Sequence, residues 1–247
     1  QFKNVSFKYP GAEEYVLKNI SFTAKPGETT AFIGSAGSGK STLANLIPRF
    51  YDVTEGEILM DGKNIKEITM HDLREQIGYV PQKAVLFSGT IASNIKFSGN
   101  VSDEQMLVAA ETAQAEDFIN EKPDKYEDAI SQGGTNVSGG QKQRLSIARA
   151  LAKKPPVYIF DDSFSALDYK TDSALRAALK KNTSNATLLI VAQRIGTIKN
   201  AEQIVVLEQG EVVGRGTHRE LLENCEIYKQ IALSQLSAEE LEKDMKQ

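Results

Sequence analysis

The sequence has little of what several classes of protein depend on. Its 247 residues include one cysteine, Cys225, and two histidines, His71 and His218, so the chain cannot form an internal disulfide and offers no plausible zinc cluster. We expect Cys225 to be an inert residue of a C-terminal helix. No window of eighteen uninterrupted apolar residues occurs, and residues 1–4 lack the layout of a signal peptide, so we expect the chain to be soluble.

A surplus of basic charge is also missing. Lysine and arginine total 29 against 33 for aspartate and glutamate, which gives a net charge of −4. Neither this balance nor any cluster of basic residues predicts binding to nucleic acid or to an anionic membrane surface. The hydrophobic share of 40% is that of an ordinary globular protein, and the length is enough for one large domain or a core with subdomains.

The main feature that is present is a glycine-rich loop at residues 34–41, which read Gly-Ser-Ala-Gly-Ser-Gly-Lys-Ser. The spacing fits a phosphate-binding loop, and an apolar strand at residues 29–33 and a helical pattern after the loop flank it as that motif requires. The glycines let backbone N–H groups surround an anion, Lys40 brings a positive charge to the outer phosphates, and Ser41 offers a hydroxyl to Mg²⁺. An incidental glycine-rich turn would not carry both flanking elements, so the loop predicts a nucleotide site.

A second sequence element, an apolar strand that ends in an aspartate, indicates that the nucleotide site also binds Mg²⁺. Residues 157–160 form an apolar strand that ends at Asp161, and such a strand delivers the carboxylate that holds Mg²⁺ opposite a phosphate loop. An aspartate that merely ends a strand at the surface is the alternative, but the phosphate loop requires an acidic partner of this kind. We therefore expect Asp161 and the Ser41 hydroxyl to bind Mg²⁺ together.

The order of apolar and helical patterns predicts the fold. Apolar strands occur before residue 85 and again after residue 155, and between them lie a capping box from Ser102 to Gln105 and a helix at 141–154. We expect an α/β fold: a P-loop NTPase (RecA-like) core with a mostly parallel sheet, an N-terminal antiparallel β subdomain and an inserted α-helical subdomain. The predicted limits are 1–85 and 155–236 for the β subdomain and core, 86–154 for the helical subdomain, and 237–247 for a charged tail, which we expect to be a solvated or frayed helix.

The deciding stretch is residues 137–144, Val-Ser-Gly-Gly-Gln-Lys-Gln-Arg. Its serine and two glycines open a helix and form a second anion-binding helix N-terminus in the same chain. A helix N-terminus without a ligand is the alternative, but the Gln-Lys-Gln-Arg that follows disfavours it. The stretch closely resembles the signature motif of ATP-binding cassette (ABC) proteins, and the resemblance extends over almost the whole chain as one nucleotide-binding domain.

The resemblance implies roles for residues outside these motifs. Tyr9 is where the family stacks an aromatic ring on adenine, Gln82 matches a glutamine that touches Mg²⁺ and reports to the membrane domains, and Asp168 is the acidic residue of a segment at the dimer interface. The implied ATP-binding residues are Tyr9, Gly34, Ser35, Ala36, Gly37, Ser38, Gly39, Lys40, Ser41, Thr42, Ser138, Gly139, Gly140, Gln141 and Asp168. The implied Mg²⁺ ligands are Ser41, Gln82 and Asp161, and the implied catalytic residues are Asp162, Gln193 and Gln82.

Residues 86–91, Leu-Phe-Ser-Gly-Thr-Ile, resemble exporters more than importers. The resemblance therefore implies a transmembrane domain with coupling helices that is not part of this chain, a second nucleotide-binding domain as dimer partner, and a position at the cytoplasmic face of the cell membrane. ATP with Mg²⁺ is the implied cofactor, and ATP-driven dimerisation is the implied step that powers substrate export.

Two positions depart from the family pattern. The family places a glutamate after the Mg²⁺ aspartate as general base, and this chain has Asp162; exporters carry a switch histidine where this chain has Gln193. Asp162 is one methylene shorter, which withdraws its carboxylate by roughly an ångström, and such a displacement can cost about a hundredfold in rate. Gln193 can donate a hydrogen bond but cannot shuttle a proton. Both changes predict slow ATP hydrolysis at this chain's own site.

The signature motif keeps its pattern apart from Val137 in place of the commoner leucine. The family binds nucleotide between the phosphate loop of one subunit and the signature of the other. The resemblance therefore implies the degenerate half of a heterodimeric multidrug exporter, whose partner carries the competent catalytic residues. A smaller departure lies at residues 131–134, which read Ser-Gln-Gly-Gly instead of Gly-Glu-Arg-Gly and bear on coupling to the membrane domain.

Two alternatives remain open. One is a homodimeric, fully hydrolytic transporter ATPase in which Asp162 suffices. The other is a nucleotide-gated structural module of the chromosome or DNA-repair type, which shares both motifs but separates them by a long coiled coil. The interval between Lys40 and Val137 contains no heptad run, which disfavours such a module, and we expect no nucleic acid partner.

Overall fold

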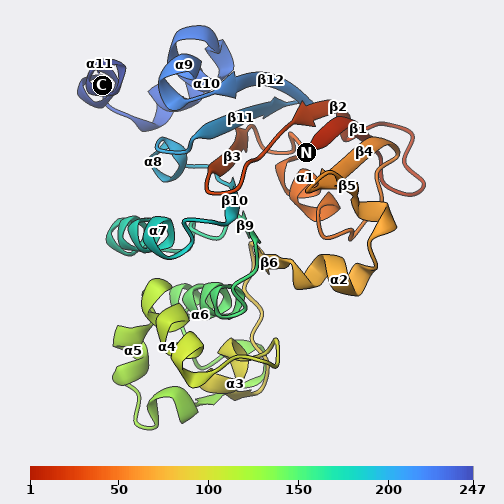
Figure 1. Ribbon diagram of the computed structural model, residues 1–247. Helices are drawn as coiled ribbons and strands as arrows, with labels where there is room; N and C mark the ends of the chain where they lie inside the picture. Colours follow the sequence, from red (N-terminus) through yellow and green to blue (C-terminus); the bar gives the residue numbers. More distant parts are fainter. Residues whose placement is uncertain (247) are drawn as a thin grey trace.

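The computed structural model describes residues 1–246 and shows strands gathered in the upper part of the molecule, with a lobe of helices below them (Figure 1). The strands are β1 (Phe2–Phe7), β2 (Leu17–Phe22), β3 (Thr29–Gly34), β4 (Glu55–Met60), β5 (Lys63–Asn64), β6 (Ile77–Val80), β7 (Gly89–Thr90), β8 (Ala129–Ile130), β9 (Val157–Asp161), β10 (Thr187–Val191), β11 (Gln203–Glu208) and β12 (Glu211–Gly216). The helices are α1 (Lys40–Leu46), α2 (Met70–Glu75), α3 (Ile91–Ile95), α4 (Asp103–Thr112), α5 (Glu116–Asn120), α6 (Gly139–Ala152), α7 (Tyr169–Asn182), α8 (Ile195–Ile198), α9 (His218–Asn224), α10 (Glu226–Gln235) and α11 (Ala238–Lys246). Short 3-10 helices are η1 (Ile65–Glu67), η2 (Lys125–Glu127) and η3 (Gln132–Gly134).

The central sheet has the strand order β12-β11-β3-β10-β9-β6. Its neighbouring strands pair in parallel except β11 and β12, which form an antiparallel hairpin at one edge. The inner strands are buried along nearly their whole length, as parallel strands covered on both faces must be. Alternate residues face different parts of the core: Ile33 and Phe160 belong to one buried cluster, and Phe32 and Ile159 belong to the other.

The two clusters tie the central sheet to different neighbours. One joins it to α1 and to the antiparallel sheet β2-β1-β4-β5. The other joins it to the helical lobe and to the C-terminal helices α9 and α10. The expected fold class is confirmed, because the chain is an α/β structure with a mostly parallel sheet, an antiparallel β part and inserted helices. The residue limits of the subdomains stay a prediction.

The helical lobe follows β6 and precedes β9, and it contains α3 to α6. The expected capping box at Ser102 is present. The helix expected at 141–154 instead spans Gly139–Ala152. It begins earlier because Ser138 caps it, and it ends earlier because Lys154, which precedes a proline, has a left-handed backbone with φ of 52°.

The C-terminal tail forms the expected helix, but it is not solvated along its whole length. In α11, Leu241 packs against the core, and Asp244 accepts a hydrogen bond of 3.2 Å from Lys199 Nζ and lies 3.3 Å from His218 Nε2. These contacts dock the helix, so the expectation of a solvated tail is wrong for these residues. Residue 247 lies outside the described part of the chain. Cys225 is buried too, at the junction of α9 and α10.

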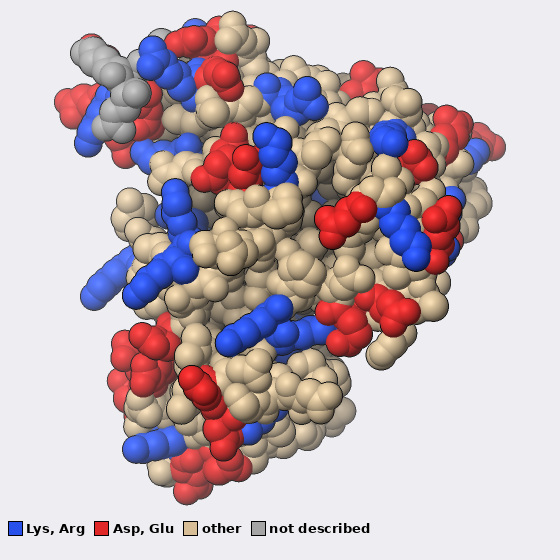
Figure 2. All heavy atoms as spheres, in the orientation of Figure 1, with Lys and Arg blue, Asp and Glu red and all other residues tan. Residues whose placement is uncertain are grey.

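The surface carries both signs of charge. On the face shown in Figure 2, Lys and Arg side chains alternate with Asp and Glu and with wide uncharged areas, so neither sign dominates that face as a whole. None of the helices within residues 1–246 combines the length and the apolar character that crossing a bilayer requires.

Candidate nucleotide site

The phosphate loop lies between β3 and α1, at the carboxyl end of a central strand. Its first glycine, Gly34, is packed so closely that a Cβ there would lie 1.9 Å from the backbone oxygen of Leu207. Gly39, which directly precedes α1, has φ of 101°, a left-handed conformation that glycine adopts without strain. Because both positions exclude a side chain, the loop can stay tight enough for its backbone to close around an anion.

Lys40 lies across its own loop. Its Nζ donates hydrogen bonds to the backbone oxygens of Gly34 at 2.9 Å and Ser35 at 2.7 Å, and to Ser38 Oγ at 3.2 Å. Burial lowers the pKa of Lys40, and nearby carboxylates, Asp162 first among them, oppose that shift. The ammonium group is therefore already placed at the loop, where a charged phosphate oxygen would bind it more strongly than the neutral acceptors do.

Ser41 and Asp161, two of the expected Mg²⁺ ligands, are in contact. Ser41 Oγ donates a hydrogen bond of 2.8 Å to Asp161 Oδ1. Tyr79 donates to Asn45 Oδ1 at 2.8 Å, and its hydroxyl lies 3.3 Å from Asp161 Oδ2, which fixes the carboxylate from its other side. Asp161 is 5% exposed, and burial raises its pKa while its hydrogen bonds lower it. A hydroxyl and a carboxylate side by side are the oxygen ligands that Mg²⁺ binds, so these residues fit the ion.

The expected catalytic residues meet at Asp162. Gln82 Nε2 donates to Asp162 Oδ2 at 3.1 Å, and Gln193 Nε2 donates to the same oxygen at 2.8 Å. Asp162 is 7% exposed; burial raises its pKa, and the negative charge of Asp161 raises it further. Gln82 was also expected to bind Mg²⁺, but its described hydrogen bond goes to Asp162 and not to Ser41 or Asp161. The fold therefore gathers all three catalytic candidates around one carboxylate oxygen.

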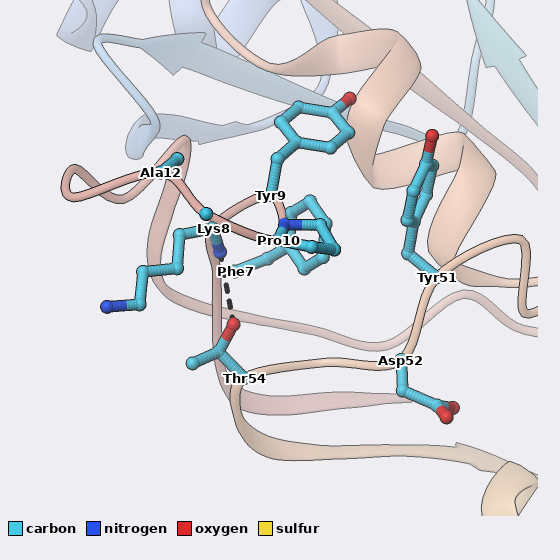
Figure 3. A pocket seen from close by; sticks show the side chains of 9 residues that line it. Phe7, Lys8, Tyr9, Pro10, Ala12, Tyr51, Asp52 and Thr54 are labelled. Carbon is cyan, nitrogen blue, oxygen red and sulfur yellow. Dashed lines mark hydrogen bonds between the residues drawn. The ribbon is translucent and has the colours of Figure 1, made fainter.

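Tyr9, expected to stack on adenine, lines an open cavity of about 560 Å³ (Figure 3). The cavity is lined by Phe7, Lys8, Tyr9, Pro10, Gly11, Ala12, Tyr51, Asp52 and Thr54. Tyr9 and Tyr51 meet edge to face, with ring centroids 5.1 Å apart and planes at 89°. The Tyr9 hydroxyl lies 2.9 Å from Thr42 Oγ1, so the ring links the cavity to the helix that follows the phosphate loop. The sequence analysis did not identify Tyr51 as a residue of this cavity, because Tyr51 belongs to no motif and only its aromatic ring suggests such a role.

The signature residues begin α6 in the helical lobe, away from α1 (Figure 1). Ser138 Oγ accepts a hydrogen bond from Gln141 N at 3.2 Å, and Gln141 Oε1 accepts one from Ser138 N at 3.1 Å, which makes a capping box. Gly139 and Gly140 form the first turn of the helix. None of the described hydrogen bonds of Ser138 or Gln141 goes to residues 34–42, so this chain alone does not bring the two motifs together.

Asp168, also expected to bind nucleotide, caps a helix in this structure. Its carboxylate accepts hydrogen bonds from Thr171 N at 3.0 Å and from Thr171 Oγ1 at 2.7 Å, at the start of α7. These bonds lower the pKa of Asp168. The preceding segment is fixed by Arg194, whose Nη2 donates to the backbone oxygen of Ser165 at 3.1 Å. Arg194 follows Gln193 in the sequence, and that adjacency was the only available signal for its role.

Two further residues that sequence reasoning missed hold the segment after Gln82. Arg149 donates to the backbone oxygens of Asn94 and Val85, both at 2.8 Å, and its guanidinium lies 5.1 Å from the centre of the Phe87 ring. Asn94 is 1% exposed, and its side chain donates to Phe87 O at 2.8 Å and accepts from Phe87 N at 2.9 Å. Neither residue belongs to a short motif, so no local sequence pattern indicates this anchor.

Comparison with known proteins places the chain in a family. A family model described as ABC transporter matches residues 17–165. The ABC transporter ATP-binding protein YfiB of Bacillus subtilis, which is uncharacterized, is 48% identical over 240 residues, covering 97% of this chain and 42% of that protein. The ATP-dependent lipid A-core flippase of Haemophilus influenzae is 46% identical over 233 residues, covering 94% of this chain and 40% of that protein.

A solved structure agrees with these relatives. It is titled the structure of a bacterial Atm1-family ABC exporter with ATP bound, and it matches 93% of this chain and 41% of its own length with a TM-score of 0.89 and 38% identity. The chain spans about two fifths of the length of the curated relatives that it matches. Since the family model covers more than half of the chain and includes the phosphate loop and the signature, this chain belongs to the ABC transporter family.

Proposed function

We propose that this chain is the ATP-binding and ATP-hydrolysing domain of an ABC exporter, that its own phosphate-loop site is slow, and that its signature completes the active site of a different, competent partner. Similarity to a flippase and to an exporter with ATP bound supports the exporter type. The position of Lys40 on the loop and the contact between Ser41 and Asp161 support ATP with Mg²⁺ as the bound nucleotide.

The environment of Asp162 is the observation that best supports slow ATP hydrolysis at this site. Gln82 and Gln193, which both donate to its carboxylate, are neutral amides. An amide can orient a carboxylate, but it cannot accept a proton from it or carry positive charge to a γ-phosphate. A proton that Asp162 takes from the attacking water therefore has no titratable group at position 193 to move to.

The shorter side chain of Asp162 should also slow ATP hydrolysis. An aspartate ends one methylene closer to the backbone than the glutamate of the family pattern, and a misplacement of roughly an ångström can cost about a hundredfold in rate. Both departures leave Lys40 and the Ser41–Asp161 pair intact, so we expect ATP binding to be kept while hydrolysis is slowed.

The separation of the two motifs supports a site shared between two domains. The phosphate loop precedes α1, whereas the signature begins α6 in the other lobe (Figure 1). The signature is well formed, because Ser138 and Gln141 cap the helix and two glycines open its first turn. A second nucleotide-binding domain would therefore receive a competent signature from this chain, and we propose that it carries the catalytic glutamate and histidine.

An exposed apolar surface supports coupling to a transmembrane domain. Val85, Phe87 and Phe97 are 53%, 43% and 58% exposed, and the rings of Phe87 and Phe97 stack with centroids 4.4 Å apart. They follow Gln82 in the chain, and exposed apolar groups of this kind are typical of contact with another domain. We propose that coupling helices of a multidrug-type exporter bind here, at the cytoplasmic face of the cell membrane.

The test is steady-state Mg-ATP hydrolysis by the chain at high protein concentration, together with ATP binding by calorimetry. The comparison variant is Asp162→Glu with Gln193→His, and Lys40→Ala controls for contaminating ATPase. Tight binding with negligible turnover, raised about a hundredfold by the double variant, is the expected result. Brisk turnover of the unmodified chain would contradict it and favour the homodimeric ATPase, and a change in turnover on adding DNA would favour the chromosome type of module.

A further inference from the structure

The side chain of Gln235 bridges the switch loop, which we define as residues 193–195. Gln235 is the last residue of α10. Its Nε2 donates a hydrogen bond of 2.8 Å to the backbone oxygen of Gln193, and its Oε1 accepts a hydrogen bond of 2.8 Å from the backbone N–H of Ile195. One side-chain amide therefore fixes both ends of the loop.

The switch loop needs this support. Ile195 opens α8, and the residue before it, Arg194, makes no side-chain cap to that helix. The first N–H groups of a helix lack an internal partner and require one from elsewhere. Gln235 supplies that partner to Ile195, from a helix that is 40 residues further along the chain.

The same contact reaches the candidate catalytic residues. Gln235 holds the backbone of Gln193, and the side chain of Gln193 donates to Asp162 Oδ2 at 2.8 Å. A rotation of the Gln193 backbone would move its amide away from that oxygen. The bond between Gln193 and Asp162 therefore depends on a residue outside every recognised motif.

The helix that carries Gln235 is itself rigidly seated. Tyr228 and Ala232, on the same helix, are 0% exposed and belong to the main core cluster. Tyr228 OH also lies 2.6 Å from His218 Nδ1. Gln235 itself is exposed, so it fills no space in the core, and its replacement leaves no cavity.

We propose that Gln235 is a positioning residue of the hydrolytic site: it holds the switch loop so that the residue at position 193 reaches the base at position 162. This inference rests on the proposed function, because it takes Gln193 and Asp162 as the switch and the base. It uses only backbone atoms of the switch loop, so the same support acts whether position 193 is glutamine or histidine.

The first test needs no catalysis. In the unmodified chain labelled with ¹⁵N, Gln235→Ala should shift or broaden the side-chain NH₂ resonance of Gln193 and speed amide exchange of Ile195 by about fivefold or more, as loss of one hydrogen bond does. Gln235→Glu keeps an acceptor for Ile195, so it should retain much of the exchange protection. Gln230→Ala is the matched control, because Gln230 is exposed on the same helix and its described side-chain hydrogen bond goes to Glu226 of that helix, at 3.3 Å.

The second test uses the Asp162→Glu, Gln193→His background, in which the proposed function predicts measurable turnover. There Gln235→Ala should lower kcat by about tenfold and leave the ATP dissociation constant unchanged, whereas Gln230→Ala should change neither. If Gln235→Ala matches Gln230→Ala in the resonance of Gln193 and the exchange of Ile195, the positioning role is overturned. If the background variant fails to hydrolyse ATP, the proposed function fails, and the resonance and exchange still decide the role of Gln235.

Discussion

Gln193 Nε2 donates a 2.8 Å hydrogen bond to Asp162 Oδ2, which joins two catalytic positions at which this chain departs from the exporter pattern. Asp162 directly follows β9 and Gln193 lies two residues past β10, and these strands are parallel neighbours in the central sheet. Carboxyl ends of parallel neighbours lie at one edge of the sheet, so the two substitutions act on one contact. A change at either position should therefore alter the environment of the other.

A double-mutant cycle should detect this pairing. Gln193→Ala and Asp162→Asn, measured singly and together by urea unfolding, should show a coupling free energy of about 1 kcal/mol, because the first removes the donor of this hydrogen bond and the second removes the negative charge that strengthens it. The control cycle pairs Gln193→Ala with Asp52→Asn, whose ionic partner is Arg49. It should be additive within about 0.5 kcal/mol, and equal coupling in both cycles would refute a specific bond.

Tyr9 should contribute to ATP binding through its ring and not through its hydroxyl. Tyr9→Ala removes the stacking surface, and since stacking on a base contributes roughly 1–3 kcal/mol, ATP affinity should fall about tenfold or more. Tyr9→Phe loses only the contact with Thr42 and should bind within about twofold of the unmodified chain. Calorimetry with ATP measures both, with Tyr15→Ala as control because Tyr15 does not line the cavity. A larger loss of ATP affinity in Tyr9→Phe than in Tyr9→Ala would show that the hydroxyl, and not the ring, contributes to binding.

Ser138 has a structural role as a helix cap and a proposed role toward the nucleotide of a partner, and two variants separate them. Ser138→Ala should lower the free energy of unfolding by about 1 kcal/mol, whereas Ser138→Asp keeps a capping oxygen and should be nearly neutral. In the Asp162→Glu, Gln193→His background, Ser138→Asp should nevertheless reduce turnover by about a hundredfold, since a carboxylate would face the γ-phosphate.

The matched control for this prediction is Ser102→Asp. Ser102 caps α4 with the same kind of capping box and lies in the same lobe, but it belongs to no nucleotide motif. It should affect neither unfolding nor turnover by a measurable amount. If Ser138→Asp hydrolyses ATP as fast as its parent, the signature of this chain does not contact nucleotide.

Arg149 should stabilise the segment that follows Gln82. Arg149→Ala leaves the backbone oxygens of the buried Asn94 and of the exposed Val85 without their donor and removes the guanidinium from the Phe87 ring, so the free energy of unfolding should fall by about 3 kcal/mol. Burial lowers the pKa of Arg149 to about 10, and it still carries its charge at neutral pH. Arg149→Lys keeps the charge without the planar fork and should lose about 2 kcal/mol. Urea unfolding measures both, and a loss below about 1 kcal/mol for Arg149→Ala would show that the anchor is not needed.

The control for Arg149 lies just past the end of the same helix. Lys153 is a basic residue whose Nζ donates to the backbone oxygen of Arg74 at 2.8 Å and pairs with the exposed Glu75 at 3.2 Å. Ion pairs with one exposed partner, such as Glu75, are screened by solvent, so Lys153→Ala should cost no more than about 1 kcal/mol. A comparable loss in both variants would mean that any basic residue in this region stabilises the chain equally.

The parts of the site that could be predicted from sequence are those whose residues are close together in the chain. The phosphate loop and the helix caps at Ser102 and Ser138 each depend on hydrogen bonds or turns within a few residues. Such patterns depend on local backbone geometry and survive in any tertiary context. The expected limits of α6 are wrong by two residues at each end, because a helix boundary depends on the cap at Ser138 and on the left-handed backbone of Lys154 and not on the helical pattern alone.

The sequence by itself determined a strand–loop–helix unit with the phosphate-loop pattern, and its resemblance to ABC proteins indicated which side chains to examine. Tertiary structure alone decided that Gln82 and Gln193 bind the same oxygen of Asp162, across 80 and 31 residues of chain. It also decided that Gln235 holds the switch loop and that the signature lies in the other lobe. These relationships depend on the order and register of parallel strands, which no short stretch of sequence encodes, because neighbours in such a sheet are joined through helices and not through local turns.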